Sequence, residues 1–131
     1  MALRRVLVAD DSRIFRVVMC DALRERGLEV LEAANGREAL DVLLSQRPDL
    51  VVLDALMPLI SGFDVIGKLR EAAPTYRPVI FIVTAVFKSR RWETEARQQY
   101  QVEEYLEKPL EAEDIFRAIG RHFPDFVVAN P

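Results

Sequence analysis

Three acidic residues and one lysine follow short apolar runs at widely separated points of this sequence. The acidic residues are Asp10, Asp11 and Asp54, the basic residue is Lys108, and Thr84 also ends an apolar run. Brought together, three carboxylates and one ammonium group carry a net charge of −2. Carboxylates held that close need a counter-ion or a proton. Oxygen ligands suit a hard divalent cation, so we expect Mg²⁺ there, with Mn²⁺ as an alternative.

The apolar runs have the length of strands, and they alternate with segments of helical periodicity. This alternation is typical of repeated βα units, which build a parallel sheet with helices on both faces. Ligands of such sheets bind beyond the carboxyl ends of the strands, where the five residues above would meet. The expected strands are Arg4–Ala9, Leu28–Ala33, Leu50–Leu53, Val79–Val83 and Glu104–Leu106.

Helices are expected between these strands. Ser12 or Asp11 can cap the first helix, and Gly27 can end it in a left-handed conformation. Its candidate core positions are Ile14, Val18 and Leu23. The later helices are expected at Glu38–Ser45, after Gly62 with Val65, Ile66 and Leu69 in the core, at Lys88–Gln101 and at Glu111–His122.

The composition indicates one domain. The chain has 131 residues, of which 50% are hydrophobic, and we expect a domain over residues 1–123 with a tail or the start of a linker over 124–131. A net charge of −3 gives no reason to expect nucleic-acid binding, and no apolar run is long enough to cross a membrane. Cys20 is the only cysteine, which excludes an internal disulfide and favours a reduced, cytoplasmic setting.

Five short blocks in this order resemble the receiver domains of bacterial two-component response regulators, such as the chemotaxis response regulator. The resemblance extends from about Val6 to His122, and it implies a flavodoxin-like, doubly wound (βα)5 fold with strand order 2-1-3-4-5. The blocks are Val6–Ser12, Ala34–Leu40, Pro48–Asp54 together with Met57-Pro58 and Gly62, Pro78–Ala85, and Tyr105–Pro109.

The resemblance implies a role for each residue at the strand ends. Asp54 matches the phosphoacceptor of the family, and a carboxylate can accept a phosphoryl group as an acyl phosphate. Asp10 and Asp11 would hold Mg²⁺ with Asp54 and the backbone carbonyl of Leu56. Lys108 would pair with the phosphoryl oxygens as a point charge. The peptide bond between Lys108 and Pro109 would be cis, which would aim the lysine side chain into the site.

The resemblance also implies which residues transmit the signal and which set the lifetime of the phosphoryl group. Thr84 would donate its hydroxyl to the phosphoryl group, and Tyr105 would rotate inward behind it, which carries the signal to a distant surface. Leu56 and Val86 match positions that flank the phosphoryl group. Both are apolar here, so we expect slow self-dephosphorylation.

The function expected from these residues is a phosphorylation-controlled switch and not a conventional enzyme. Its partners would be a sensor histidine kinase or a histidine phosphotransfer protein, and a downstream target or an output domain outside this chain. A homodimer is possible. The segment with Lys88, Arg90, Arg91 and Trp92 is either a solvated helix face or a partner-specific surface.

Other functions remain open at this point. Singly, each residue has an ordinary role; Asp10-Asp11, for example, is more often a helix-capping turn. A receiver used only as a phosphorylation-independent interaction module is the main alternative. A haloacid-dehalogenase phosphatase would need two aspartates separated by one residue, whereas Asp10 and Asp11 are adjacent. A flavodoxin-like flavin carrier would need a phosphate-cradling loop after the first strand, which is missing.

Overall fold

A five-stranded parallel sheet forms the centre of the molecule in the computed structural model, which describes residues 2–85, 94 and 98–127. The strand order β2-β1-β3-β4-β5 and the doubly wound fold confirm the prediction. The central strand is buried along its whole length because both faces of the sheet are covered. The strands are β1 (Arg5–Ala9), β2 (Glu29–Ala33), β3 (Leu50–Asp54), β4 (Val79–Thr84) and β5 (Glu104–Glu107).

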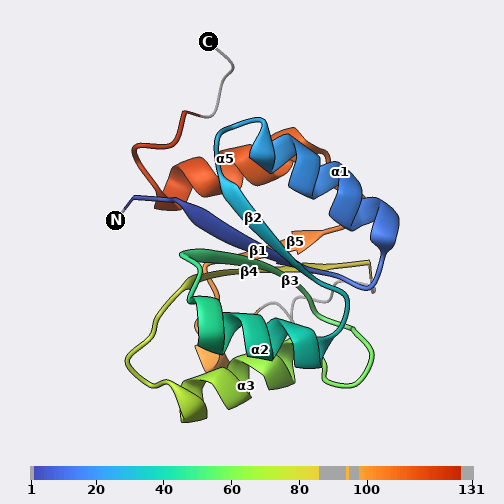
Figure 1. Ribbon diagram of the computed structural model, residues 1–131, viewed down its shortest axis with the longest axis vertical. Helices are drawn as coiled ribbons and strands as arrows, with labels where there is room; N and C mark the ends of the chain where they lie inside the picture. Colours follow the sequence, from blue (N-terminus) through green and yellow to red (C-terminus); the bar gives the residue numbers. More distant parts are fainter. Residues whose placement is uncertain (1, 86–93, 95–97, 128–131) are drawn as a thin grey trace.

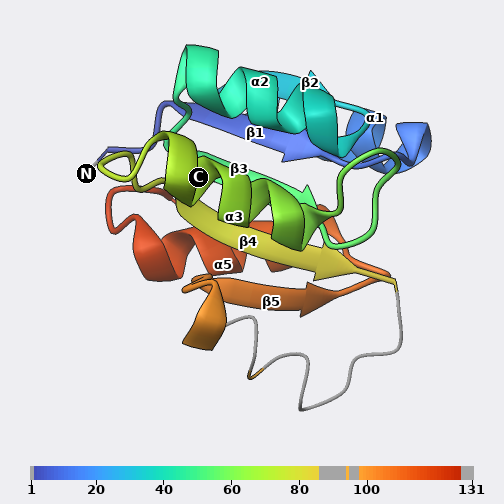
Figure 2. The same cartoon turned by 90° about the horizontal axis from the view of Figure 1, so that it is seen from below.

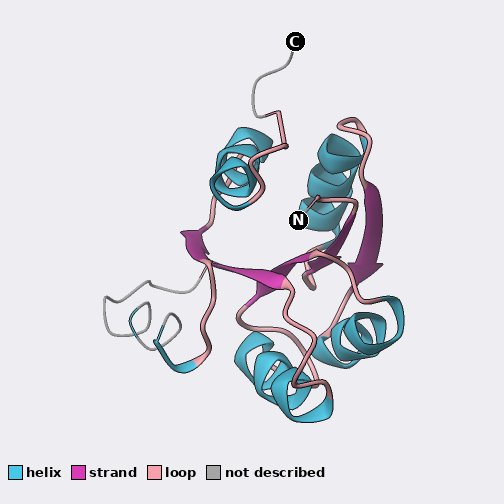
Figure 3. Ribbon diagram, turned by 90° about the vertical axis from the view of Figure 1, so that its left-hand side faces the viewer, coloured by secondary structure: helices cyan, strands magenta, loops and turns pink. Residues whose placement is uncertain are grey.

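Four helices in the described part of the chain cover the two faces of the sheet. α1 (Arg13–Arg24) and α5 (Ala112–His122) lie on one face, and α2 (Gly36–Gln46) and α3 (Gly62–Ala72) lie on the other (Figures 1 and 3). Among the described residues, none of the helices has both the length and the apolar composition to cross a membrane.

Two apolar clusters fix the helices to the sheet. Successive residues of a strand point to opposite faces, so Leu7 belongs to the cluster under α2 and α3, whereas Val8 belongs to the cluster under α1 and α5. The same alternation places Ile82 on the first side and Phe81 on the second. Each cluster removes apolar surface from water, which is the main favourable contribution to folding.

The predicted core face of α1 was partly wrong. Leu23 is buried as expected, but the side chains of Ile14 and Val18 are 79% and 57% exposed. Met19 and Cys20 take the core positions in their place. The helix carries two apolar stripes at helical spacing, and periodicity alone does not tell which stripe faces the sheet.

The helix ends follow from local hydrogen bonds. α2 begins at Gly36, two residues earlier than predicted, because the Asn35 side chain accepts a hydrogen bond from the backbone N–H of Glu38 at 2.9 Å. Arg47 ends this helix in a left-handed conformation (φ 46°), since the following proline disfavours helical backbone. Gly27 has φ 81° after α1, as predicted.

The segment predicted as a helix over Lys88–Gln101 lies outside the described residues except for 94 and 98–101. Lys88, Arg90, Arg91 and Trp92 are among the residues not described. The chain after α5 is described to Val127, and Phe126 packs there against Phe116 with ring centroids 5.9 Å apart. The boundary at residue 123 stays a prediction.

Candidate functional site

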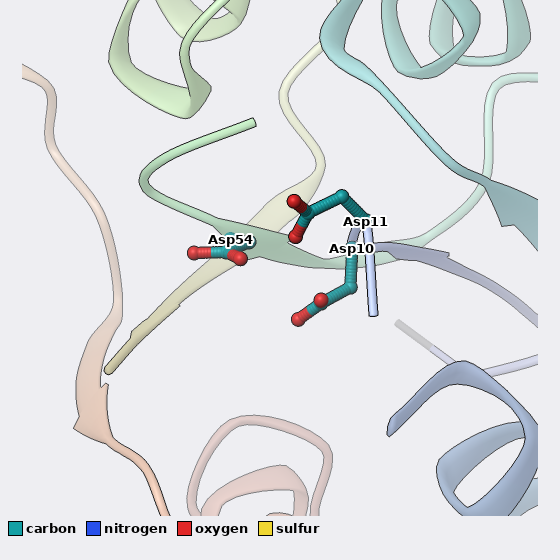
Figure 4. Close-up of side chains that lie close together, drawn as sticks. All are labelled: Asp10, Asp11 and Asp54. Carbon is teal, nitrogen blue, oxygen red and sulfur yellow. The ribbon is translucent and has the colours of Figure 1, made fainter. Parts of the chain in front are cut away.

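The sheet brings Asp10, Asp11 and Asp54 together at the carboxyl ends of β1 and β3 (Figure 4). These three residues form the aspartate cluster, and each offers a carboxylate oxygen within 4.8 Å of those of the other two. Asp10 and Asp54 are buried, whereas Asp11 is exposed. β1 and β3 are neighbouring parallel strands, so Asp54 lies at the same edge as Asp10 and Asp11, which are 44 and 43 positions earlier in the chain.

Lys108 reaches the aspartate cluster from the end of β5. Its Nζ lies 2.6 Å from Oδ2 of Asp10 and 3.8 Å from Oδ2 of Asp54. The ammonium group also sits over the ring of Phe15, 4.3 Å from the centroid. Its backbone N–H donates to the carbonyl of Thr84 at 2.9 Å, and the bond to Pro109 is cis. Lys108 therefore balances only part of the negative charge.

Asp10 is held more firmly than Asp54. Its Oδ1 accepts a hydrogen bond from the backbone N–H of Ser12 at 2.8 Å, and its Oδ2 faces Lys108. The Arg16 guanidinium donates to its backbone carbonyl at 2.7 Å. Asp54 accepts one N–H, from Leu56 at 3.2 Å. The carboxylate of Asp54 thus has the fewer partners and is the better placed to react.

The charge of Asp54 is disfavoured in this site. Burial and the neighbouring Asp10 raise its pKa from 3.8 to about 6, against the opposing effects of the Leu56 N–H and Lys108. A divalent cation would remove this penalty. The donor set consists of carboxylate oxygens, the ligands that Mg²⁺ prefers, and it fits such an ion.

The two proposed switch residues lie on neighbouring strands. Thr84 ends β4 and is fully buried. Tyr105 lies in β5 opposite Ile82, and its side chain is only 2% exposed, within the cluster under α2 and α3. Of the residues expected to tune hydrolysis, Leu56 is 48% exposed beside the cluster, and Val86 lies outside the described residues.

Sequence reasoning missed several residues that support the site. Phe15 and Arg16 contact Lys108 and Asp10 from the first turn of α1, which begins two residues after Asp11, so their position in the chain was a usable signal. Gly62 was placed at the start of the third helix, but the sequence did not indicate its close approach to β3. Its backbone N–H donates to the carbonyl of Ala55 at 2.9 Å, and α3 thereby begins against the end of β3.

Replacing Gly62 with alanine is expected to destabilise the protein by about 3 kcal/mol, as overpacking against backbone does. An added Cβ would overlap the carbonyl oxygen of Asp54 and lie 3.0 Å from Cα of Ala55. Urea unfolding measures the loss. Gly67→Ala is the matched control on the same helix, because its Cβ meets nothing within 4 Å, and it should be neutral or stabilising. Equal stability of the two variants would contradict the prediction.

Comparison with known proteins shows to which protein family the chain belongs. Residues 6–120 match the model of the family described as response regulator receiver domain. A similar curated protein is the transcriptional regulatory protein PdtaR of Mycobacterium tuberculosis, 34% identical over 117 residues, which cover 88% of this chain and 55% of PdtaR. The chain spans about half the length of the first curated relatives that it matches.

Proteins of similar length also match. Sporulation initiation phosphotransferase F of Bacillus subtilis is 25% identical over 120 residues, which cover 92% of this chain and 94% of that protein. The structure of the chemotaxis protein CheY4 of Vibrio cholerae superposes with a TM-score of 0.82 at 29% identity, covering 92% of this chain and 98% of that one. On the strength of the family match, the chain belongs to the response regulator receiver domains.

Proposed function

We propose that this chain accepts a phosphoryl group on Asp54 in a Mg²⁺-dependent reaction and acts as a switch in a two-component system or phosphorelay. The observation that carries the proposal is the position of Asp54, which is buried beside two further carboxylates and lies 3.8 Å from the Lys108 ammonium group. The chain would act on itself only and would not be a conventional turnover enzyme.

In the proposed reaction, a carboxylate oxygen of Asp54 attacks the phosphorus atom of the donor. A new O–P bond forms, and the bond between phosphorus and the donor's leaving group breaks, with its electron pair going to the leaving group. Asp10, Asp11, Asp54 and the Leu56 carbonyl would hold Mg²⁺, which when bound neutralises charge on the phosphoryl oxygens. Lys108 would turn from Asp10 toward those oxygens. The turn is short, because its Nζ already lies near the carboxylates of both Asp10 and Asp54.

The readout would pass through Thr84 and Tyr105. A phosphoryl group on Asp54 offers oxygens for the Thr84 hydroxyl, and Thr84 lies at the end of the strand that pairs with β5. Tyr105 is already inside the protein, so phosphorylation would hold its ring in this inward position. The consequence would be a fixed arrangement of the surface next to β5.

The phosphodonor would dock on α1. The side chains of Ile14, Val17 and Val18 form what we call the α1 outer face, and they are 79%, 45% and 57% exposed. A groove of about 420 Å³ runs from this face to Lys108 and Pro109. We propose that a helix of a histidine kinase or histidine phosphotransfer protein lies here, because such a helix can bring a phosphohistidine to Asp54 while covering the apolar side chains.

Intact-mass measurement after incubation with acetyl phosphate and Mg²⁺ tests the proposal. One phosphoryl adduct is expected on the natural protein, and none on Asp54→Asn or in the presence of a chelator. The absence of an adduct on folded protein would instead favour a phosphorylation-independent interaction module. For either function, the output would depend on a partner protein or a linked domain outside this chain.

Replacing Leu56 with asparagine is expected to speed loss of the phosphoryl group by about tenfold. This is less than the roughly hundredfold or more that a positioned proton-accepting group contributes, because asparagine can orient a water molecule but does not take its proton. The Leu56 side chain lies at the open side of the site and can exclude water but cannot orient it. The decay of the mass adduct after removal of the donor measures the rate. Leu56→Met keeps an apolar side chain and should leave the lifetime unchanged. Equal lifetimes for asparagine and methionine would contradict the prediction.

A further inference from the structure

A second pocket, of about 330 Å³, lies between α3 and the chain that leads into β5. Its residues Arg77 and Gln101 come just before β4 and β5, at the opposite end of the strands from the aspartate cluster. Figure 2 shows α3 and β5 with β4 between them. The residues that line the pocket are Ile66, Gly67, Arg70, Arg77, Gln99, Tyr100 and Gln101.

Across residues 2–85, 94 and 98–127, two arginines of this pocket have no acidic side chain at ion-pair distance. Nη2 of Arg70 donates to the backbone carbonyl of Tyr100 at 3.2 Å, while Nη1 is buried and has no hydrogen-bond partner among the described residues. Nη1 of Arg77 donates to the amide oxygen of the Gln101 side chain at 3.2 Å. Within the described part of the chain, neither guanidinium forms an ion pair.

The electrostatics of the pocket favour a negative occupant. Burial lowers the pKa of Arg70, and the charge of Arg77 lowers it further, whereas Glu103 raises it. Glu103 accepts a hydrogen bond from the backbone N–H of Ile80 at 2.7 Å. A buried N–H donor without a partner is costly, and two neighbouring cations repel each other. A bound anion would relieve both effects.

We propose that Arg70 and Arg77 bind an oxyanion in this pocket, as a phosphate or carboxylate group. The planar guanidinium fork matches the oxygens of either group. The walls are well packed, because the rings of Phe63 and Tyr100 lie 5.1 Å apart at a tilt of 36°. Gly67 adds open space, since a Cβ there would meet nothing within 4 Å. An occupant would connect α3 to the residues just ahead of β5.

An NMR titration of the chelator-treated protein tests the site, with inorganic phosphate in one arm, acetate in the other and chloride at matched ionic strength as the reference. Saturable shifts in the millimolar range or tighter are expected at the amides of Gly67 and Gln101. Arg70→Gln and Arg77→Gln should each weaken binding by about tenfold or more, as loss of a charge-assisted hydrogen bond does. Lys68→Gln removes an exposed charge from the same helix and should change nothing.

The two arms of the titration identify the natural occupant. Tighter binding of phosphate than of acetate would point to a phosphate ester, and tighter binding of acetate would point to a side-chain carboxylate. The site is independent of the phosphoacceptor, so Asp54→Asn should bind equally. Three results would overturn the proposal: no saturation with either anion, unchanged binding by Arg70→Gln, or shifts confined to the Lys108 edge.

A gain-of-contact variant provides a second test that does not remove an arginine. Gly67→Glu would place a carboxylate one turn before Arg70, in the open space of the pocket. We expect it to melt about 3 °C above its neutral control Gly67→Gln, because the new carboxylate would pair with Arg70, and to lose phosphate binding. Equal melting temperatures of the two variants together with retained phosphate binding would contradict the proposed position.

Discussion

Replacing Ile14 and Val18 together with aspartate is expected to slow phosphoryl transfer from a histidine-phosphorylated donor protein by about a hundredfold at subsaturating donor concentration. Covering a branched aliphatic side chain is worth about 1.5 kcal/mol or more, and tenfold in affinity corresponds to about 1.4 kcal/mol. The two side chains are 79% and 57% exposed, so their replacement leaves the core intact. Time courses with a phosphorylated donor measure the loss.

The comparison with a small donor makes this prediction specific. Acetyl phosphate needs no docking face, so the double variant should gain the phosphoryl group from it at the natural rate. Leu44→Asp changes an exposed leucine on α2 and is the matched control. Equal slowing with both donors would show damage to the site instead of lost docking, and unchanged transfer from the protein donor would contradict the role of α1.

Asp54→Asn is expected to stabilise the metal-free protein near neutral pH, by on the order of 2 to 3 kcal/mol. The pKa of Asp54 is about 6 in the folded protein and 3.8 for the ordinary group. The folded state therefore binds the proton of the Asp54 carboxyl group more tightly than the unfolded state does. The stability associated with this group is present below pH 4 and is lost as the pH rises through 6. Asparagine carries no charge and escapes that loss.

Urea unfolding in the presence of a chelator measures this effect at about pH 7.5 and about pH 4. The stability gap between Asp54→Asn and the natural protein should be large at the higher pH and should mostly close at the lower one. Added Mg²⁺ at the higher pH should stabilise the natural protein more than the variant. A gap that does not shrink on acidification would contradict the assigned cause.

The sheet and the aspartate cluster could be predicted from the sequence because they depend on the order of the chain. Asp54 ends one parallel strand, and Asp10 and Lys108 directly follow two others, so the sheet must place these residues at one edge whatever the details of packing. The start of α2 was predicted two residues late because the side chain of Asn35 sets it. Local capping of this kind is harder to recognise than an apolar run.

Other features could not be predicted because they depend on contacts between distant segments. Both apolar stripes of α1 fit helical spacing, and only the assembled core shows that Met19, and not Ile14, faces the sheet. The need for glycine at position 62 arises from the backbone of Asp54. The pocket with Arg70 and Arg77 likewise forms only when α3 meets the chain before β5.

Borohydride trapping after phosphorylation tests the central claim most directly. Borohydride reduces the acyl carbon of an aspartyl phosphate to an alcohol and expels phosphate, which leaves a permanent mark on the modified residue. After reaction with acetyl phosphate and Mg²⁺, peptide sequencing by mass spectrometry should place the reduced side chain at Asp54 and nowhere else. A reduced residue at Asp10 or Asp11, or an adduct that resists borohydride, would contradict the assignment of Asp54 as the phosphoacceptor.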